Sequence, residues 1–250
     1  MSSRVRCLWG AEAGRDLSHD DVADLYRWPE EGRWVRAMMV TTLDGAAAGP
    51  DGLSGSISSE ADKAVFDAVR RFADAVLIGA GTLRAERYRP MRAQDADAER
   101  RRAAGQLPAP TLVVVSGSLD LPWSEPVFAE SAQTPIVVTG TDADPMQVAW
   151  ARTQCDLEVV DSPRPSAGDV VAVLERRGLR RIVCEGGPTL LDEFVRTGLL
   201  DEADISLSPG FAGTAHSPNG VGPESVAWLR LEHVLTADDF LMMRYVRHDA

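Results

Sequence analysis

The sequence predicts an α/β fold with a mostly parallel central sheet, helices on its faces and an antiparallel hairpin at the C-terminus. Short apolar runs alternate with amphipathic segments along most of the chain, which is typical of parallel strands joined by helices. Two of these runs end in glycine turns, at residues 79–82 and 186–189, and each turn opens a helix. Near the end of the chain, two apolar segments flank Asp238 and Asp239, as in a β-hairpin.

The first elements are a short helix and a strand. Ser18 precedes a helical segment and can cap it with its hydroxyl, and Pro29 ends that segment. Residues 34–43 form an apolar run and predict a strand. Asp44 and Gly45 close this strand with a turn.

Helices and strands alternate in the central part of the chain. Residues 46–56 are small and glycine-rich, so they form a loop. Residues 59–71 form a helix capped by Ser59, because apolar side chains recur along one face. Further apolar runs predict the remaining strands of the sheet, at residues 75–78, 111–115, 135–138, 157–160, 181–184 and 204–207. Amphipathic segments predict further helices, at residues 145–153, at residues 169–177 and from Pro188 to near Gly198.

The C-terminal part contains a long loop and a hairpin. Residues 208–223 are rich in glycine and proline and form the loop. Strands at residues 231–235 and 240–246 form the hairpin and add antiparallel edge strands to the sheet. Because no low-complexity linker or repeat divides the chain, we expect one domain at residues 34–250, preceded by an N-terminal extension with a short helix at residues 1–33.

The bulk composition of the 250-residue chain disfavours several classes of protein. Its net charge of −12 argues against a nucleic-acid binder, which usually carries a basic face. No apolar run approaches the roughly 20 residues that span a bilayer, and the N-terminus lacks the apolar stretch of a secretory signal, so we expect a cytoplasmic protein without a membrane partner. The three cysteines are scattered and the four histidines lack metal-ligand spacing, so we expect neither disulfides nor a metal site.

The segment Cys184-Glu185-Gly186-Gly187-Pro188 carries the strongest functional signal. Its glycines permit a sharp turn and close approach of a ligand to the backbone, and Pro188 suits the first position of a helix. The free amides at such a helix start form an anion site, which commonly holds a phosphate. Glu185 would repel that phosphate, so we expect it to point toward a second ligand. The alternative is a tight strand-to-helix turn with a solvated glutamate.

The turn Gly79-Ala80-Gly81-Thr82 repeats this arrangement. Neither turn completes the dinucleotide pattern G-x-G-x-x-G, because Arg84 stands where the third glycine would be, and the chain contains no G-x-x-x-x-G-K-[ST] loop. The two turns are therefore interpreted as two separate helix starts, each of which can bind a phosphate. A dinucleotide needs such sites for its pyrophosphate.

Other polar residues allow two interpretations. Asp44 either closes the first strand in an Asx-turn, which its Asp-Gly pair favours, or places a carboxylate beside the pocket. Ser54 and Ser56 are spare donors for a ligand. The histidines form no catalytic triad and the sequence has no G-x-S-x-G elbow, so a cofactor is expected to supply the reactive group. Hydride transfer needs little more than two ligands held face to face.

In combination, these motifs resemble the reductase domain of bacterial riboflavin biosynthesis, a member of the dihydrofolate-reductase-like fold. The resemblance depends on motifs in the family's order and spacing, namely Thr42-Leu43-Asp44-Gly45, residues 73–82, Cys184-Glu185-Gly186-Gly187-Pro188, and Leu207-Ser208-Pro209 followed by Gly213. The resemblance covers roughly residues 34–247. It is greatest to the stand-alone pyrimidine-reductase-like proteins of actinobacteria. The zinc signature of the deaminase half is missing.

The resemblance implies an NADPH-dependent oxidoreductase that reduces 5-amino-6-(5-phosphoribosylamino)uracil and forms a homodimer. It implies that the cofactor contacts Val40, Ser56, Gly79, Gly81, Thr82, Ser116, Gly186, Gly187, Pro188, Thr189 and Leu190. The 2′-phosphate would lie at Ser116-Gly117-Ser118. The substrate would contact Ser54, Arg70, Glu185 and an arginine of the region 89–92, such as Arg92. As catalytic residues, Asp44 would orient or protonate the substrate and Glu185 would hold its base.

The sequence departs from the family pattern in the first strand and the loop after it. Met38 stands where the family has a lysine, six residues before Asp44, and Thr42 replaces a serine. The family's W-I-T segment is Ser56-Ile57-Ser58 in this chain. Loss of the lysine removes a positive charge from the substrate side of the cleft. Two alternatives therefore stay open, a reductase of dihydrofolate or another pteridine and a non-catalytic NADPH-binding protein.

Overall fold

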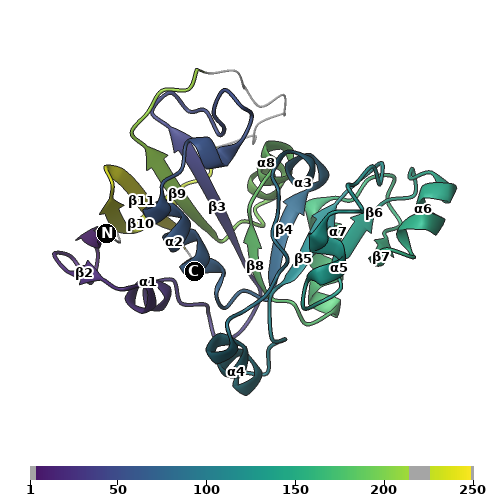
Figure 1. Cartoon of the computed structure of the whole chain (residues 1–250), viewed down its shortest axis with the longest axis horizontal. Helices are drawn as coiled ribbons and strands as arrows, with labels where there is room; N and C mark the ends of the chain where they lie inside the picture. The colour runs from purple at the N-terminus through teal and green to yellow at the C-terminus, as the bar shows by residue number, and fades with distance from the viewer. Residues whose placement is uncertain (1–3, 214–225, 249–250) are drawn as a thin grey trace.

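The computed structural model describes residues 4–213 and 226–248, which form one large sheet with helices on both faces (Figure 1). The strands of this sheet are β1 (Val5–Trp9), β2 (Asp16–Leu17), β3 (Trp34–Thr42), β4 (Ala75–Gly79), β5 (Thr111–Val115), β6 (Ile136–Thr139), β7 (Asp156–Val159), β8 (Arg181–Cys184), β9 (Glu202–Ser208), β10 (Leu229–Ala237) and β11 (Phe240–Arg247). Their order across the sheet is β2-β1-β10-β11-β9-β3-β8-β4-β5-β6-β7.

Most of the sheet is parallel. From β9 through β3, β8, β4, β5 and β6 to β7, each pair of adjacent strands is parallel. The C-terminal strands β10 and β11 form an antiparallel hairpin, and β11 pairs antiparallel with β9. The predicted fold class is therefore confirmed. The carboxyl ends of β3, β8 and β4 meet at one edge, where ligands bind in open α/β sheets.

The helices are α1 (His19–Leu25), α2 (Glu60–Arg70), α3 (Ala80–Ala85), α4 (Asp95–Ala103), α5 (Pro126–Glu130), α6 (Pro145–Ala151), α7 (Ala167–Arg176) and α8 (Pro188–Arg196), with a 3₁₀ turn η1 (Ser54–Ser56). The predicted caps are confirmed, since the hydroxyl of Ser18 accepts from the amide of Asp21 and that of Ser59 from the amide of Asp62. The sequence interpretation assigned no helix of its own to α4 or α5. The charged segment of α4 lacks a broad apolar face, and α5 is only five residues long.

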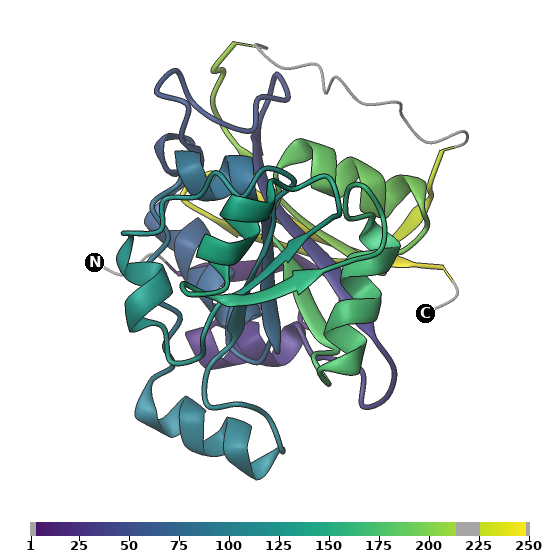
Figure 2. The ribbon, with the colours of Figure 1, turned by 90° about the vertical axis from the view of Figure 1, so that its right-hand side faces the viewer.

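The helices cover both faces of the sheet because side chains alternate along each strand. In β8, Ile182 and Cys184 pack in the core beneath α7 and α8, whereas Val183 packs in the core beneath α1 and α2. Figure 2 shows α7 and α8 on one side of the strands and α2 and α5 on the other. By the same alternation, Glu185 follows β8 on the α2 side. This places its carboxylate near the end of α2.

The N-terminal segment is built into the main sheet. β1 pairs antiparallel with β10 and buries Val5 and Cys7, while its alternate residues stay exposed. The expectation that the hairpin β10–β11 forms the edge is therefore wrong, because β1 and β2 lie outside it. Five residues with two buried side chains give too short a pattern to predict this strand. The division at residues 1–33 and 34–250 remains a prediction.

The start of β9 also differs from the expected residue 204. The strand begins at Glu202, whose fully buried carboxylate lies 2.7 Å from Nε of Arg36 and 2.8 Å from Nε of Arg244. A charged residue normally argues against a buried strand position, but two arginines neutralise this one. The predicted loop 208–223 is described only to residue 213, and the rest lies outside the described residues.

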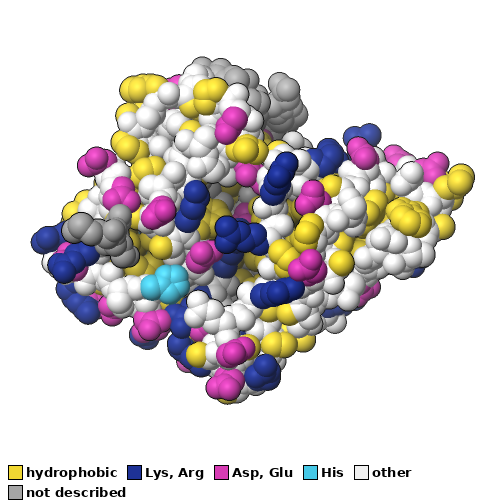
Figure 3. All heavy atoms as spheres, viewed as in Figure 1, with side chains coloured by type: hydrophobic (Ala, Val, Ile, Leu, Met, Phe, Trp, Pro, Cys, Tyr) yellow, Lys and Arg dark blue, Asp and Glu magenta, His cyan; other side chains and the backbone are white. Residues whose placement is uncertain are grey.

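On the face seen in Figure 3, acidic and basic side chains are interspersed with apolar ones. Within the described part of the chain, no helix has the length and apolar character needed to cross a bilayer.

Candidate functional site

The two glycine turns lie side by side because β4 and β8 are neighbours in the sheet. The amide of Gly79 donates to the carbonyl of Gly186 at 2.9 Å. A Cβ added to Gly187 would come within 2.9 Å of Oγ1 of Thr82, closer than real side chains approach. Gly186 has a φ of 96°, which favours glycine. The sequence predicted two phosphate-binding helix starts, and the structure brings them together at one edge.

The N-terminus of α8 fits an anionic group. Pro188 occupies its first turn, and the N-cap Gly187 provides no side chain to satisfy the free amides. Thr189, in the first turn of the helix, is exposed. The side chain of Leu190 lies in the core and its amide donates to the carbonyl of Gly187, and its predicted contact with the cofactor stays a prediction. The helix dipole and the uncapped amides favour an anionic group at this position.

Glu185 lies immediately before these glycines and forms an ion pair with Arg70, the last residue of α2. Nε of Arg70 donates to Oε1 and Nη2 donates to Oε2, so the pair is bidentate. The Glu185 side chain is only 2% exposed. Tyr88 donates its hydroxyl to Oε2 at 3.2 Å. The alternative of a solvated glutamate is therefore wrong, and the two predicted substrate residues Arg70 and Glu185 lie together.

The serine-containing loop reaches the segment after α3. The amide of Ser54 donates to Oε1 of Glu86 at 2.7 Å. The hydroxyl of Ser56 lies 2.8 Å from Oδ1 of Asp51 and 2.9 Å from the carbonyl of Leu53. Ser56 is thus engaged within its own loop and is not a spare donor in this structure. Its predicted contact with the cofactor stays a prediction, as does the contact of Ser54 with substrate.

Asp44 joins the loop after β3 to the segment after β9. Its carboxylate accepts from the hydroxyl of Thr42 and from the amides of Gly213 at 2.8 Å and Ala212 at 3.3 Å. The bond from Thr42, followed by the two amides, lowers the pKa of Asp44. At neutral pH this group is a carboxylate that holds two loops together, rather than a proton donor. Figure 1 shows these two loops side by side above β3 and β9.

The loop after β5 carries the predicted 2′-phosphate residues. Ser116 is buried, and its hydroxyl accepts from the amide of Leu119 at 2.9 Å, so it stabilises its own turn. The hydroxyl of Ser118 accepts from the amide of Asp120 at 3.3 Å. Nη1 of Arg84 donates to the carbonyl of Asp120 at 2.7 Å, which places a cation beside this loop. Nothing in the sequence pattern pointed to that contact.

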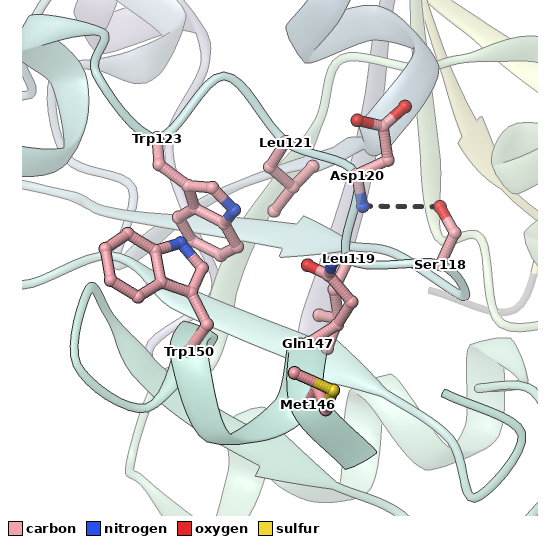
Figure 4. A pocket seen from close by; sticks show the side chains of 8 residues that line it. All are labelled: Ser118, Leu119, Asp120, Leu121, Trp123, Met146, Gln147 and Trp150. Atoms are coloured by element: carbon pink, nitrogen blue, oxygen red, sulfur yellow. Dashed lines mark hydrogen bonds between the residues drawn. The ribbon is translucent and has the colours of Figure 1, made fainter. Parts of the chain in front are cut away.

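A hollow of about 590 Å³ adjoins the same loop (Figure 4). It is lined by Ser118, Leu119, Asp120, Leu121, Trp123, Met146, Gln147 and Trp150. Only Ser118 is shared with the predicted cofactor loop. Because neither Glu185 nor a glycine turn lines this hollow, we do not place the chemistry there.

Three further residues from the sequence analysis lie at the surface or in the core, and the predicted ligand contacts of Arg92 and Val40 stay predictions. Arg92 donates to the carbonyl and the carboxylate of Glu130 on α5 and is 63% exposed, so it is held at the surface. Val40 packs in the core with α2. Met38, in the place of the family lysine, is also a core residue, which explains why an uncharged side chain is tolerated there.

Sequence reasoning missed Tyr88 and Glu86. Both follow α3 in a segment dominated by arginines, where no spacing rule selects one residue. The aromatic ring of Tyr88 among charged neighbours was the one available signal. In the described residues, no group of three or more His, Cys, Asp and Glu side chains could hold a metal ion.

The chain is similar to known proteins of one family. The model of the RibD C-terminal domain family matches residues 33–241. The chain is 28% identical to the 2,5-diamino-6-ribosylamino-4(3H)-pyrimidinone 5′-phosphate reductase of Archaeoglobus fulgidus, over 77% of this chain and 87% of that protein. It is 31% identical to the reductase of the same name from Methanothermobacter thermautotrophicus, over 69% of this chain and 76% of that protein.

A solved structure of a pyrimidine reductase-like protein from Corynebacterium diphtheriae superposes with a TM-score of 0.76. The superposition covers 86% of this chain and 91% of the Corynebacterium chain, and the two sequences are 24% identical. This likeness shows the shared fold.

Proposed function

Because the chain belongs to the RibD C-terminal domain family, we propose that it is an NADPH-dependent oxidoreductase of riboflavin biosynthesis. Its substrate is a phosphoribosylated aminopyrimidine, with 5-amino-6-(5-phosphoribosylamino)uracil as the first candidate. The reaction converts the ribosyl group to a ribityl chain. One observation carries this proposal. Two glycine turns contact each other at one edge of the sheet, and the Arg70–Glu185 ion pair lies at the same edge.

The open N-terminus of α8 fits the pyrophosphate of a nicotinamide dinucleotide. Gly187 and Thr189 would hold it through their backbone amides, and the absence of a side chain at Gly187 leaves room beside Thr82. When bound, the reduced nicotinamide supplies the hydride for C1′ of the open, imine-like sugar. Arg84 and Ser118 would hold the 2′-phosphate, because a guanidinium and a hydroxyl suit a phosphate dianion. This arrangement favours NADPH over NADH.

Glu185 would hold the pyrimidine, and Arg70 would hold Glu185. A carboxylate accepts hydrogen bonds from ring N–H and amino groups, and a bidentate arginine fixes its plane. Asp44 would keep the loops after β3 and β9 in place, since its lowered pKa makes it a poor acid. We also propose that the enzyme works in the cytoplasm as a homodimer, as the family resemblance implies. Light scattering on the purified protein measures the oligomeric state.

The activity is tested by the loss of nicotinamide absorbance when the protein is mixed with NADPH and the uracil substrate. Parallel reactions use the diamino-pyrimidinone ribotide named for the archaeal relatives, and dihydrofolate. We expect turnover with a pyrimidine and none with dihydrofolate. Turnover of dihydrofolate alone would reject the pyrimidine assignment, and NADPH binding without any turnover would support a non-catalytic protein.

The variant Glu185→Gln separates the two ligands. It keeps the size of the side chain but removes the charge that Arg70 pairs with. We expect kcat/KM to fall roughly 10- to 100-fold, since a hydrogen bond to a charged group is worth about 1.5–3 kcal/mol. The dissociation constant of NADPH should stay within about twofold of the native value. Loss of NADPH binding in this variant would mean that Glu185 faces the cofactor.

A further inference from the structure

Tyr88 completes a cluster of three side chains at the carboxyl end of β8. Its hydroxyl donates to Oε2 of Glu185 at 3.2 Å, and its ring centroid lies 5.9 Å from the guanidinium carbon of Arg70. The ring of Phe66, on α2, lies 5.3 Å from the same guanidinium carbon. Two aromatic rings at these distances can attract the cation in addition to the carboxylate. Tyr88 therefore contacts both members of the ion pair.

The hydrogen bonds of Glu185 leave room for one further donor. A carboxylate offers about four lone-pair directions. Among the described residues, Nη2 of Arg70 and the hydroxyl of Tyr88 donate to Oε2, whereas only Nε of Arg70 donates to Oε1. Oε1 thus retains the capacity to accept one further hydrogen bond. Because the side chain is 2% exposed, a hydrogen bond formed there would be shielded from bulk water.

We propose that Tyr88 is a positioning residue for the substrate base. Together with Arg70 it fixes the Glu185 carboxylate, so that the remaining lone pair of Oε1 accepts an N–H of the aminopyrimidine. Tyr88 acts through Glu185, transfers no proton and touches no reacting atom. The inference rests on the proposed function, because it requires a pyrimidine at Glu185.

A tyrosine suits this role better than a second cation. Burial, followed by the charge of Glu185, raises the pKa of Tyr88 well above its usual value. The phenol therefore remains a neutral donor throughout the neutral pH range. A second arginine would add a charge and compete with Arg70 for the same oxygens.

The test uses the full chain with Tyr88→Phe, which removes the hydroxyl and keeps the ring against Arg70. The affinity for the uracil ribotide is measured by calorimetry in the presence of NADP⁺, together with KM, kcat and the NADPH dissociation constant. We expect the substrate dissociation constant and KM to rise about tenfold, which corresponds to about 1.4 kcal/mol. The NADPH constant should stay within about twofold. Tyr245→Phe is the matched control, because within residues 4–213 and 226–248 the hydroxyl of Tyr245 bonds only to the sulfur of Met243, at 3.7 Å.

The outcomes separate this inference from the proposed function. If the native protein binds the ribotide and Tyr88→Phe binds it equally well, the role of Tyr88 is refuted and the proposed function stands. If the variant loses ribotide and NADPH affinity in equal measure, Tyr88 is only structural and the inference is also refuted. If the native protein does not bind the ribotide, both proposals fall.

Discussion

Glu185 and Gly187 are two residues apart and serve opposite electrostatic purposes. Gly187 begins α8 without a side chain, so the free amides at this helix start favour an anion. Glu185 would repel the same anion, but its carboxylate lies on the α2 side and pairs with Arg70. The turn between them therefore separates a site for negative charge from a site for hydrogen-bond donors. This separation lets a phosphate-bearing cofactor and a pyrimidine lie near each other.

The variant Gly187→Asp tests the anion site at the scale of one residue. The new Cβ would approach Oγ1 of Thr82 within 2.9 Å, and the new carboxylate would stand among the free amides of α8. We expect the NADPH dissociation constant, measured by calorimetry, to rise at least about tenfold through both crowding and charge repulsion.

The matched control for this variant is Gly168→Asp, also at a helix start. A Cβ there meets nothing closer than Oγ of Ser166 at 3.7 Å. Unchanged NADPH affinity in Gly187→Asp would exclude the N-terminus of α8 as the pyrophosphate site.

The direction of Glu185 was predictable from sequence, but its partners were not. The charge of the residue and the anion preference of the adjoining turn sufficed to expect that it turns away from phosphate. Arg70 and Tyr88 are 115 and 97 residues distant along the chain, and only the folded sheet brings them to Glu185. The pairing of Arg92 with Glu130 depends in the same way on the fold, through the packing of α5, and its predicted contact with substrate stays a prediction.

At the scale of elements, a buried ionic network joins β3, β9, β10 and β11 on the α1 side of the sheet. Arg36 and Arg244 flank Glu202, and Asp204 follows two residues later on the same face of β9. His233 of β10 is 3% exposed and packs edge-on against Tyr26, with 4.8 Å between ring centroids. Because Arg36, Glu202, Asp204 and His233 are buried, their protonation bears on the stability of the fold.

The titration of His233 predicts a pH dependence of stability. Burial, followed by the charge of Arg244, lowers the pKa of His233 from 6.5 to about 4. Between these values the unfolded chain binds a proton that the folded chain does not, so His233 makes the fold less stable as pH falls from about 6.5 to about 4. The loss approaches about 3 kcal/mol in the free energy of unfolding.

This contribution is isolated by comparing the native chain with His233→Gln in urea titrations at several pH values. The comparison is needed because burial also raises the pKa of Asp204, whose titration makes the fold more stable as pH falls. We expect the native chain to lose stability relative to the variant as pH falls below 6.5. A difference that does not change with pH would mean that His233 is protonated in the folded state.

At the scale of the whole molecule, local patterns predicted the sheet better than they predicted its borders. Apolar runs of four or five residues identified the parallel strands, because these strands are buried on both faces. The order of the strands and the place of β1 depend on pairings between distant segments, which no local period records. Local patterns therefore predict the N-terminal segment as an extension, whereas β1 covers the outer edge of the C-terminal hairpin.

Deletion of residues 1–17 tests whether this segment is dispensable. The deletion removes β1 and β2, uncovers the edge of β10 and takes Val5, Cys7 and Leu17 out of the core with α1 and α2. Because a fully buried apolar side chain contributes roughly 1.5–3 kcal/mol, we expect the free energy of unfolding in urea to fall by several kcal/mol. An unpaired edge of β10 should also promote association between chains.

Point variants keep this prediction testable if the shortened chain does not fold. Val5→Ala removes buried methyl groups, whereas Leu8→Ala alters a neighbour in β1 that is 49% exposed. We expect Val5→Ala to lower the urea midpoint clearly and Leu8→Ala to leave it almost unchanged. NADPH affinity should be retained in both, because β10, β11, β9 and β3 separate β1 from the strands that carry the glycine turns. Equal urea midpoints for the native and shortened chains would show instead that residues 1–17 are an appendage, and that the reductase domain holds its core without them.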